Sequence, residues 1–198
     1  MRCLRCDGKL RSIRCDSPNF AFAMKKIVIT GPESSGKTTL AGSLASHYSG
    51  GLVREMVRCY FAQRTIPMNG YEEMELRTIA ELQLHEEDRV AVVTANPGGK
   101  MIVCDTDLIT IRIWGEEKYG RSDPWIVQRT EERPYDLWLL CRPEMPWEPD
   151  PLRENPHDRD RLFDVYETTL KRLGKPYIVV EGGPEQRMKS AVNAIDMK

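Results

Sequence analysis

Short apolar runs alternate along the chain with longer stretches of helical periodicity. The apolar runs have the length of buried strands and cover residues 26–30, 51–54, 101–104, 137–141 and 177–180. The helical stretches cover residues 37–48, 71–93, 108–119, 159–173 and 184–197. Strands that alternate with helices form βαβ units, because parallel neighbours need a crossover connection. The pattern therefore predicts an open α/β fold with a five-stranded parallel sheet and helices on both faces.

Length and composition limit the kind of protein that this chain can be. It has 198 residues, 40% of them hydrophobic and 30% charged, which suits one domain with a substantial core. Its 29 basic and 30 acidic residues give a net charge of −1, so no basic field predicts a nucleic-acid partner. No apolar run approaches the roughly 18 residues that a membrane span needs. We therefore expect a cytoplasmic domain without nucleic-acid or membrane partners, and the sequence leaves its oligomeric state open.

Residues 1–23 differ from the rest, since they are basic and show no sustained periodicity. They lack the apolar segment of a secretory signal. Cys3, Cys6 and Cys15 supply fewer ligands than the four of a structural zinc site, so a metal knuckle is only an alternative. Met24 directly precedes the first predicted strand, which favours a domain at residues 24–198 behind an over-extended start or a disordered tail. The remaining cysteines, Cys59, Cys104 and Cys141, stand apart in the sequence, as reduced structural cysteines do.

A complete phosphate-loop pattern follows the first predicted strand. Residues 31–38 read GPESSGKT, which matches G-x-x-x-x-G-K-[ST], and a predicted helix begins at its end. Glycines let successive N–H groups face phosphate oxygens, and the helix N-terminus adds donors and positive potential. Lys37 is expected to reach the β- and γ-phosphates, and the Thr38 hydroxyl to bind Mg²⁺. The residues expected to bind ATP are Gly31, Glu33, Ser34, Ser35, Gly36, Lys37, Thr38 and Thr39.

Acidic residues follow two further strands, at the edge where parallel sheets bind ligands. Asp105 ends the strand at 101–104 and is expected to hold the Mg²⁺ shell or to orient an attacking hydroxyl. Asp107 is expected to share that role, and the alternative is a cap on the next helix. Glu55 follows the second strand and suits the activation of an acceptor hydroxyl, the alternative being an ordinary surface glutamate.

A lid and a group of aromatic residues favour a small-molecule kinase over other phosphate-loop proteins. Residues 142–161 are rich in Pro, Asp and Arg, and Arg153, Arg159 and Arg161 could bring positive charge to a transferred phosphoryl group. The alternative is a solvated charged loop. Aromatic rings also cluster between Asp105 and this segment, and each by itself suits the core better than a stacking wall for a flat ring. They are Trp114, Tyr119, Trp125, Tyr135, Trp138 and Trp147.

Taken in order, these motifs resemble the ribosylnicotinamide (nicotinamide riboside) kinase domain of bacterial NAD-biosynthesis proteins of the NadR type. The resemblance rests on residues 31–40, 54–58, 105–107, 135–140 and 146–153, and it extends over nearly all of 24–198. Only the phosphate loop is generic, since the ordered set is fairly specific to this group of P-loop kinases and AAA-like ATPases. The resemblance implies a P-loop NTPase three-layer sandwich with a lid. It also implies that ATP phosphorylates the ribose 5′-hydroxyl of nicotinamide riboside, with Mg²⁺ as cofactor.

The resemblance implies roles for individual residues. Lys37 and Thr38 would hold the triphosphate and Mg²⁺, and Asp105 would activate the hydroxyl. The residues that would take part in catalysis are Lys37, Glu55, Asp105 and Arg153, the last from the lid. The residues that would line the substrate side are Glu55, Arg58, Gln83, Asp107 and Trp114, with Trp114 stacking on the pyridinium ring, a contact of ~0.5–2 kcal/mol.

Two departures from this family leave alternatives open. Its multifunctional members also carry an adenylyltransferase domain and a helix-turn-helix domain, for which these 198 residues have no room, so we expect neither NAD synthesis nor operator binding from them. Glu144 stands before Met145-Pro146-Trp147, where an aspartate is expected. The alternatives are a kinase for another nucleoside or small alcohol and an ATP-dependent regulatory module with little kinase turnover.

Overall fold

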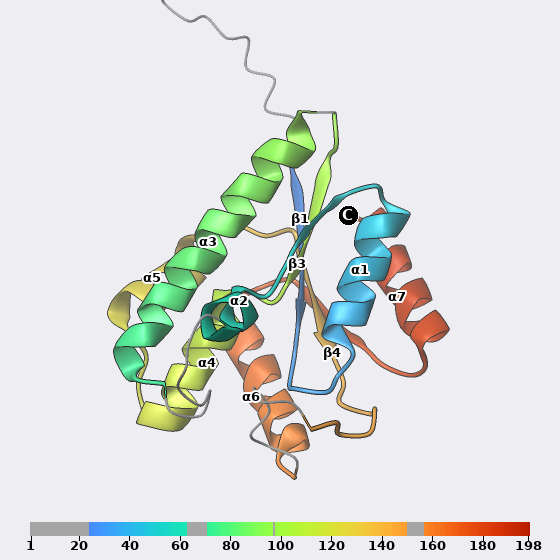
Figure 1. Ribbon diagram of the computed structural model, residues 1–198. Helices are drawn as coiled ribbons and strands as arrows, with labels where there is room; N and C mark the ends of the chain where they lie inside the picture. The colour runs from blue at the N-terminus through green and yellow to red at the C-terminus, as the bar shows by residue number, and fades with distance from the viewer. Residues whose placement is uncertain (1–23, 63–70, 97, 150–156) are drawn as a thin grey trace, which may run out of the picture.

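The computed structural model describes residues 24–62, 71–96, 98–149 and 157–198. The predictions for residues 1–23 and for Arg153 lie outside these ranges. Within them, five parallel strands form one sheet in the order β2-β3-β1-β4-β5 (Figure 1). The strands are β1 (Lys25–Thr30), β2 (Gly51–Val53), β3 (Met101–Asp105), β4 (Leu137–Cys141) and β5 (Tyr177–Val180). The predicted open α/β fold and its five-stranded parallel sheet are confirmed.

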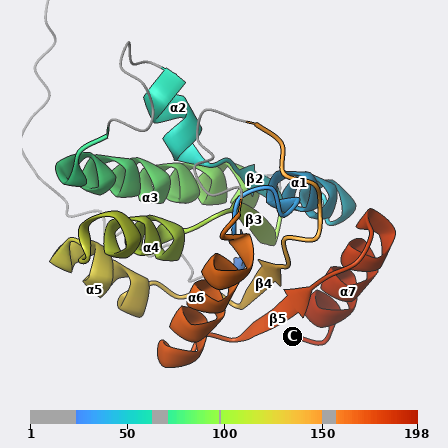
Figure 2. The same ribbon diagram turned by 90° about the horizontal axis from the view of Figure 1, so that it is seen from below.

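Helices cover both faces of this sheet. One face packs on α1 (Lys37–His47) and α7 (Pro184–Asp196), which lie together in Figures 1 and 2. The other face packs on α3 (Glu73–Ala95), α4 (Leu108–Tyr119) and α6 (Arg159–Arg172). Two shorter helices, α2 (Met56–Ala62) and α5 (Pro124–Glu132), complete a third apolar cluster with α3 and α4. The result is the expected three-layer arrangement.

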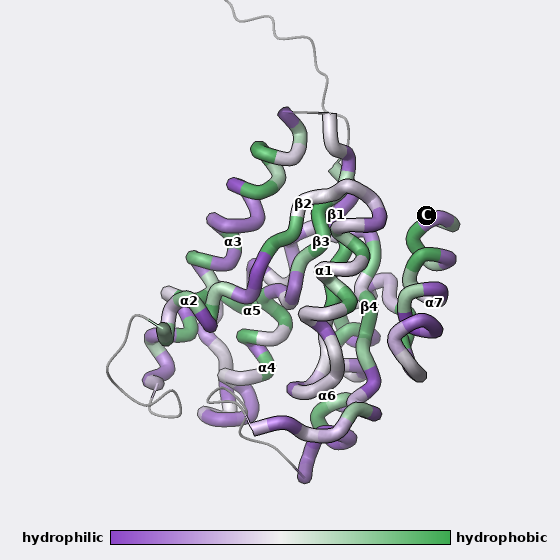
Figure 3. Tube along the Cα trace, turned by 45° about the vertical axis from the view of Figure 1, so that its right-hand side comes forward, coloured by the Kyte–Doolittle hydropathy of each residue, from purple (hydrophilic) through white to green (hydrophobic). Residues whose placement is uncertain are grey.

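The strands alternate their side chains between the two helical layers. In β1, Ile27 and Ile29 face the α1–α7 layer, whereas Val28 between them faces the α4–α6 layer. This period of two follows from the pleat of a strand. Trp138 in β4 is 1% exposed and fills the second layer. Hydrophobic residues therefore follow the central strands, and hydrophilic ones gather on the outer turns of the helices (Figure 3).

The differences from the predicted elements are local. Strand β2 ends at Val53, and β3 extends through Asp105. Two helices were missed in the prediction, α2 and α5. For α5 a signal is present in the sequence, since Asp123 accepts a hydrogen bond from Trp125 N and Pro124 occupies the first turn. The short α2 is held by tertiary packing, because Val57 and Phe61 are buried in the third cluster.

Parallel topology gathers several loops at one end of the sheet. The carboxyl ends of β1, β3 and β4 all lie at the lower edge in Figure 1. The phosphate loop, Asp105 and the start of the lid segment follow these three ends. In the part of the chain that the structure describes, no helix has the length and apolar character needed to cross a membrane.

Candidate active site

The phosphate loop runs from the end of β1 to the first turn of α1. Gly31 has φ +131°, and a Cβ there would lie 2.7 Å from the carbonyl oxygen of Cys141 in β4. Gly36 caps α1 with φ +79°, and a Cβ there would lie 2.8 Å from Met145 Cε. Backbone conformation therefore favours glycine at both positions, and at Gly31 the close approach of the β4 backbone also leaves no room for a side chain.

Polar contacts inside the loop hold its curvature. The Ser35 hydroxyl donates to Pro32 O at 2.7 Å, and Lys37 Nζ donates to the same carbonyl at 2.5 Å. The Lys37 ammonium thus lies against the loop. The N-terminus of α1 follows directly, so its unpaired N–H groups and dipole add positive potential at the same place. The loop is built to bind an anion.

Asp105 lies beside the phosphate loop, because β3 pairs with β1 and places Asp105 opposite Ile29. The next residue, Thr106, has φ +73° and donates its N–H to Ile29 O at 3.0 Å, so the chain turns sharply after Asp105. Thr38 lies beside Asp105 and favours its ionised form, and Asp105 Oδ1 is buried without a hydrogen-bond partner among the described residues. Burial raises the pKa of Asp105, and Thr38, Lys37 and Arg58 oppose the rise.

Glu55, between β2 and α2, joins this group. Its Oε2 accepts a hydrogen bond from Arg58 Nε at 3.1 Å. Burial raises the pKa of Glu55, Lys37 opposes the rise, Asp105 adds to it, and Arg58 opposes it again. The charges of Lys37 and Arg58 therefore stabilise the ionised forms of both Glu55 and Asp105, and the two carboxyls lie close enough for Asp105 to disfavour the ionisation of Glu55. The structure brings Lys37, Glu55, Arg58 and Asp105 together at this end of the sheet, and the catalytic and substrate roles expected of them stay predictions.

Gln83 supports the backbone next to Glu55. It comes from α3, is 2% exposed, and its Oε1 accepts a hydrogen bond from Met56 N at 2.9 Å. Its Nε2 is buried and has no hydrogen-bond partner among the residues that the structure describes. A buried amide donor without a partner is costly in a native structure, so a ligand acceptor beside it would be favourable.

Asp107 does not share the position of Asp105. Its Oδ1 accepts from Ile109 N at 3.2 Å and caps α4, and its Oδ2 accepts from Trp138 Nε1 at 2.9 Å. Both oxygens are thus used inside the core, and Asp107 is 2% exposed. Burial raises its pKa to about 7, with the Trp138 bond opposing the rise. The helix-cap alternative is the one that the structure supports, and the proposed substrate contact is not.

The aromatic residues are mainly core residues in the structure. Trp114 is partly buried and packs in the third apolar cluster, its ring centroid 6.3 Å from that of Tyr71. Tyr135 donates to Glu87, and the Arg77 guanidinium lies 4.0 Å from the Trp125 ring centroid. No contact of Trp114 reaches the phosphate loop within the described residues, so its stacking on a substrate ring stays a prediction.

The first part of the lid segment, residues 142–149, lies against the phosphate loop. Glu148 N donates to the Ser34 hydroxyl at 3.4 Å. Arg159, at the start of α6, donates to Met145 O at 2.8 Å and to Ser34 O at 3.3 Å. Arg161 instead pairs with Glu117 and Asp158, so it does not bring charge to the loop as expected. Its partners on α4 and at the α6 N-terminus hold it there.

One residue near the loop was not anticipated from the sequence. Arg187 of α7 is 2% exposed and hydrogen-bonds the carbonyl of Ser35 at 2.8 Å. An arginine on an amphipathic helix carries no local signal of such a contact. The contact arises because the tertiary structure packs β5 and α7 beside β4 and the phosphate loop.

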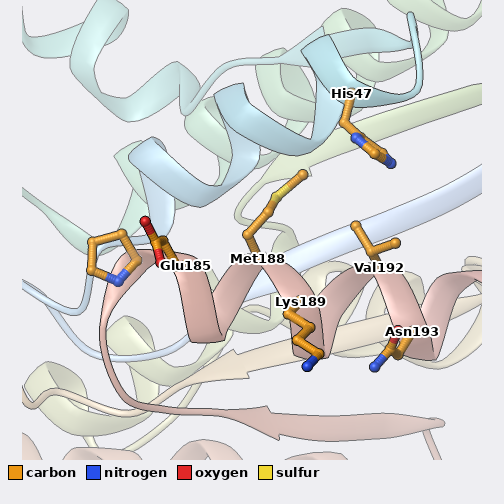
Figure 4. Close-up of a pocket in the computed structure, with 7 residues that line it drawn as sticks. His47, Glu185, Met188, Lys189, Val192 and Asn193 are labelled. Atoms are coloured by element: carbon orange, nitrogen blue, oxygen red, sulfur yellow. The ribbon is translucent and has the colours of Figure 1, made fainter.

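An open groove between α1 and α7 does not belong to this site (Figure 4). Its volume is about 480 Å³, and in the close-up His47 of α1 faces Met188 and Val192 of α7. None of the phosphate-loop residues or the acidic residues of the site lines it. The residues that line it are His47, Pro184, Glu185, Met188, Lys189, Val192 and Asn193.

The residues beside the loop fit a magnesium ion that arrives with a nucleotide. Among the described residues, no three acidic, histidine or cysteine side chains gather into a metal cluster. Mg²⁺ bound with a nucleotide needs only one or two protein oxygens, because phosphates and water complete its shell. The buried, unpartnered Oδ1 of Asp105 and the adjacent Thr38 hydroxyl supply that donor set.

Comparison with known sequences agrees with this geometry. A model of the AAA domain family matches residues 26–187. The trifunctional NAD biosynthesis/regulator protein NadR of Salmonella typhimurium is 29% identical over 147 residues. That alignment covers 71% of this chain and 33% of the relative, so the chain spans about a third of that protein. The resemblance to NadR-type proteins is thereby confirmed.

Solved structures agree with the fold. NadR in complex with NAD and AMP-PNP superposes with a TM-score of 0.74 at 19% identity, covering 87% of this chain and 49% of that one. NadR in complex with NR gives 0.72 at 18% identity, covering 87% and 51%. Deoxyadenosine kinase from M. mycoides gives 0.60 at 15% identity, covering 87% and 100%. The fold is that of P-loop kinases, and by its sequence the chain belongs to the AAA domain family.

Proposed function

We propose that this protein is an ATP-dependent kinase that phosphorylates the ribose 5′-hydroxyl of nicotinamide riboside and forms nicotinamide mononucleotide. The observation that carries the kinase assignment is the group of Glu55 and Asp105 beside Lys37. Both carboxyls are desolvated, Lys37 favours the ionised form of each, and Asp105 disfavours the ionised form of Glu55. A carboxylate at that position suits a reaction in which a hydroxyl must lose its proton to become a nucleophile.

The chain's own residues then divide the work. The N–H groups of the phosphate loop and Lys37 bind the triphosphate, and Asp105 accepts the proton of the acceptor hydroxyl. The hydroxyl oxygen bonds to the γ-phosphorus as the bond from that phosphorus to the β–γ bridging oxygen breaks, and ADP leaves. Mg²⁺ held by Thr38 and Asp105 would neutralise charge on the phosphates when bound. Residues 142–149, already against the loop, would limit the access of water.

The substrate side is assigned from the same group. Glu55 and Arg58, joined at 3.1 Å, would face the acceptor, and the unpartnered Nε2 of Gln83 would donate to it. Trp114 remains the candidate for stacking on the pyridinium ring, and Arg153 the candidate from the lid. Nicotinamide riboside is supported as the acceptor by the relatedness to NadR, one structure of which is a complex with NR.

A kinase for another nucleoside is the second candidate. Deoxyadenosine kinase is matched over its full length, whereas the two NadR structures are matched over about half of their chains. The phosphate loop and the acidic residues would serve either acceptor. The two readings differ only in which ring is bound near α2, α3 and α4.

The test is conversion of ATP to ADP by the full chain with Mg²⁺ and different acceptors. Nicotinamide riboside, adenosine, deoxyadenosine, thymidine and no acceptor are compared, and the phosphorylated product is identified by mass. Lys37→Ala serves as the inactive control. Strong stimulation by nicotinamide riboside alone supports the proposal, and stimulation by another nucleoside supports the second candidate. Slow hydrolysis that no acceptor changes would contradict both and indicate a regulatory ATPase.

A further inference from the structure

Arg187 forms a buried junction behind the phosphate loop. Its Nη1 donates to Ser35 O at 2.8 Å, and its Nε donates to Gly182 O at 2.7 Å. Its Nη2 donates to Arg142 O at 2.8 Å and to Glu144 Oε2 at 3.1 Å. The guanidinium therefore joins the phosphate loop, the residues that follow β4 and the loop between β5 and α7.

Glu144 belongs to the same junction, because its carboxylate accepts hydrogen bonds from both Arg187 and the loop between β5 and α7. Its Oε2 also accepts from Gly182 N at 2.6 Å, so one carboxylate oxygen bridges Arg187 and the β5–α7 loop. Glu144 lies near the start of the lid segment, two residues after Arg142. The side chain that departs from the aspartate expected in the family is therefore the partner of the buried arginine, and its extra methylene group gives it a longer reach.

The bond to Ser35 bears on the direction of a loop donor. In a trans peptide the C=O and the following N–H point in opposite directions, and the described residues contain no cis bond. With Ser35 O held by Arg187, the N–H of Gly36 points away from the guanidinium. Gly36 is the residue just before Lys37, where the motif needs an N–H directed at phosphate oxygen. Rotating that peptide would require breaking a charge-assisted hydrogen bond.

We propose that Arg187 is a positioning residue for the nucleotide. It holds the Ser35–Gly36 peptide with its N–H on the phosphate side, and it ties the first lid residues to the same loop. The planar guanidinium is needed because carbonyl oxygens from three separate segments must be reached at once, which a lysine ammonium on a flexible stem does not do in fixed geometry. The inference rests on ATP being the nucleotide of the proposed kinase.

The experiment compares Arg187→Lys with wild type in the full chain. Affinity for the analogue AMP-PNP with Mg²⁺ is measured by calorimetry, and the KM values for ATP and for the acceptor are measured separately. Because the bonds lost are charge-assisted and buried, we expect about tenfold weaker binding of AMP-PNP and a similar rise in the KM for ATP. The acceptor KM should stay within twofold, because the hydrogen bonds of Arg187 within the described residues go to Ser35, Arg142, Glu144 and Gly182 and not to the acceptor side.

The matched control is Arg112→Lys. Arg112 is also a buried arginine, 4% exposed, but it bonds Glu116 of α4 and Thr130 of α5 and not a residue of the phosphate loop. A purely structural role for Arg187 would make the two variants equivalent in nucleotide affinity at equal folded fraction. Weaker AMP-PNP binding in Arg187→Lys but not in Arg112→Lys supports the proposal, and equal affinities in both would overturn it.

A second pair of variants avoids the risk that a buried substitution prevents folding. Glu144→Ala removes the exposed partner of Arg187, and Glu181→Ala removes a similarly exposed acid that pairs with Arg142 at 3.1 Å. Glu144→Ala should weaken AMP-PNP binding about twofold to fivefold, as expected for one hydrogen bond, and Glu181→Ala should not. Unchanged affinity in Glu144→Ala would overturn the proposal. If wild type fails to bind AMP-PNP, the proposed function fails as well, whereas normal wild-type binding with unaffected variants removes only the role of Arg187.

Discussion

Asp105→Asn is expected to slow phosphoryl transfer without loosening the fold. Asp105 is 5% exposed, and asparagine has the same shape, so no cavity results. The amide oxygen can still accept a hydrogen bond from the neighbouring Thr38 hydroxyl. The amide nitrogen then occupies the place of the unpartnered oxygen, where it is a donor and cannot take a proton. The variant thus removes one chemical property and preserves the packing.

The variant is expected to lower kcat but not the free energy of unfolding at pH 8. Loss of the proton acceptor should lower kcat about 100-fold to 10,000-fold, which is about 2.7–5.4 kcal/mol of barrier. Burial raises the pKa of Asp105, so its ionised form is less favourable in the folded than in the unfolded chain. That cost is absent at acidic pH, where the carboxyl is protonated in both states, and it grows as pH rises. At pH 8 the asparagine variant should therefore be at least as stable as wild type.

Two assays check this reasoning. Steady-state kinetics give kcat at several Mg²⁺ concentrations, and urea unfolding without nucleotide or Mg²⁺ gives the free energy of unfolding at pH 5 and pH 8. A loss of kcat that extra Mg²⁺ restores would assign Asp105 to the metal shell, and a loss that persists assigns it to the hydroxyl. A kcat within threefold of wild type would refute both roles. A variant less stable than wild type by more than about 1 kcal/mol at pH 8 would refute the electrostatic argument.

Three further predictions follow from single contacts. Lys37→Ala should abolish ATP turnover while leaving the melting temperature nearly unchanged, because the one hydrogen bond of Lys37 within the described residues is to the carbonyl of Pro32; retained turnover would contradict its role. Gly31→Ala should lower the free energy of unfolding by about 2 kcal/mol or more, since its φ is strained for alanine and its Cβ would meet Cys141 O at 2.7 Å; a neutral effect in urea unfolding would contradict this packing. Burial raises the pKa of Asp107 to about 7, so between about pH 4 and pH 7 only the unfolded chain ionises and wild type loses stability as pH rises. Relative to Asp107→Asn this loss should reach up to about 4 kcal/mol in urea unfolding without ligand, and a difference independent of pH would show that Asp107 does not titrate there.

The sheet and the phosphate loop were predictable because their signals are local. Each strand was an apolar run bounded by polar residues, and the loop between β1 and α1 carries its glycines at fixed spacing. Helix α5 could have been found in the same way, since Asp123 and Pro124 mark its start. Helix α2 could not, because seven residues without a capping signal are stabilised only by the cluster into which Val57 and Phe61 pack.

For the acidic residues, the sequence predicted which end of the sheet they occupy but not their partners. Asp105 and Asp107 are two positions apart in one motif, yet one faces the loop and the other caps α4 and binds Trp138. The turn at Thr106, with φ +73°, separates them. Sequence spacing alone cannot show such a turn, because a non-glycine residue adopts that conformation only when surrounding contacts impose it.

By itself the sequence determined the parallel α/β fold and the phosphate-binding chemistry, since strand periodicity and the strand–loop–helix motif act over neighbouring residues. The tertiary structure decided which distant side chains meet. Glu55 reaches Asp105 because β2 lies next to β3, and Arg187 reaches Ser35 because α7 packs beside α1. These contacts depend on the order of strands in the sheet, and burial then sets the charge states of the groups that meet.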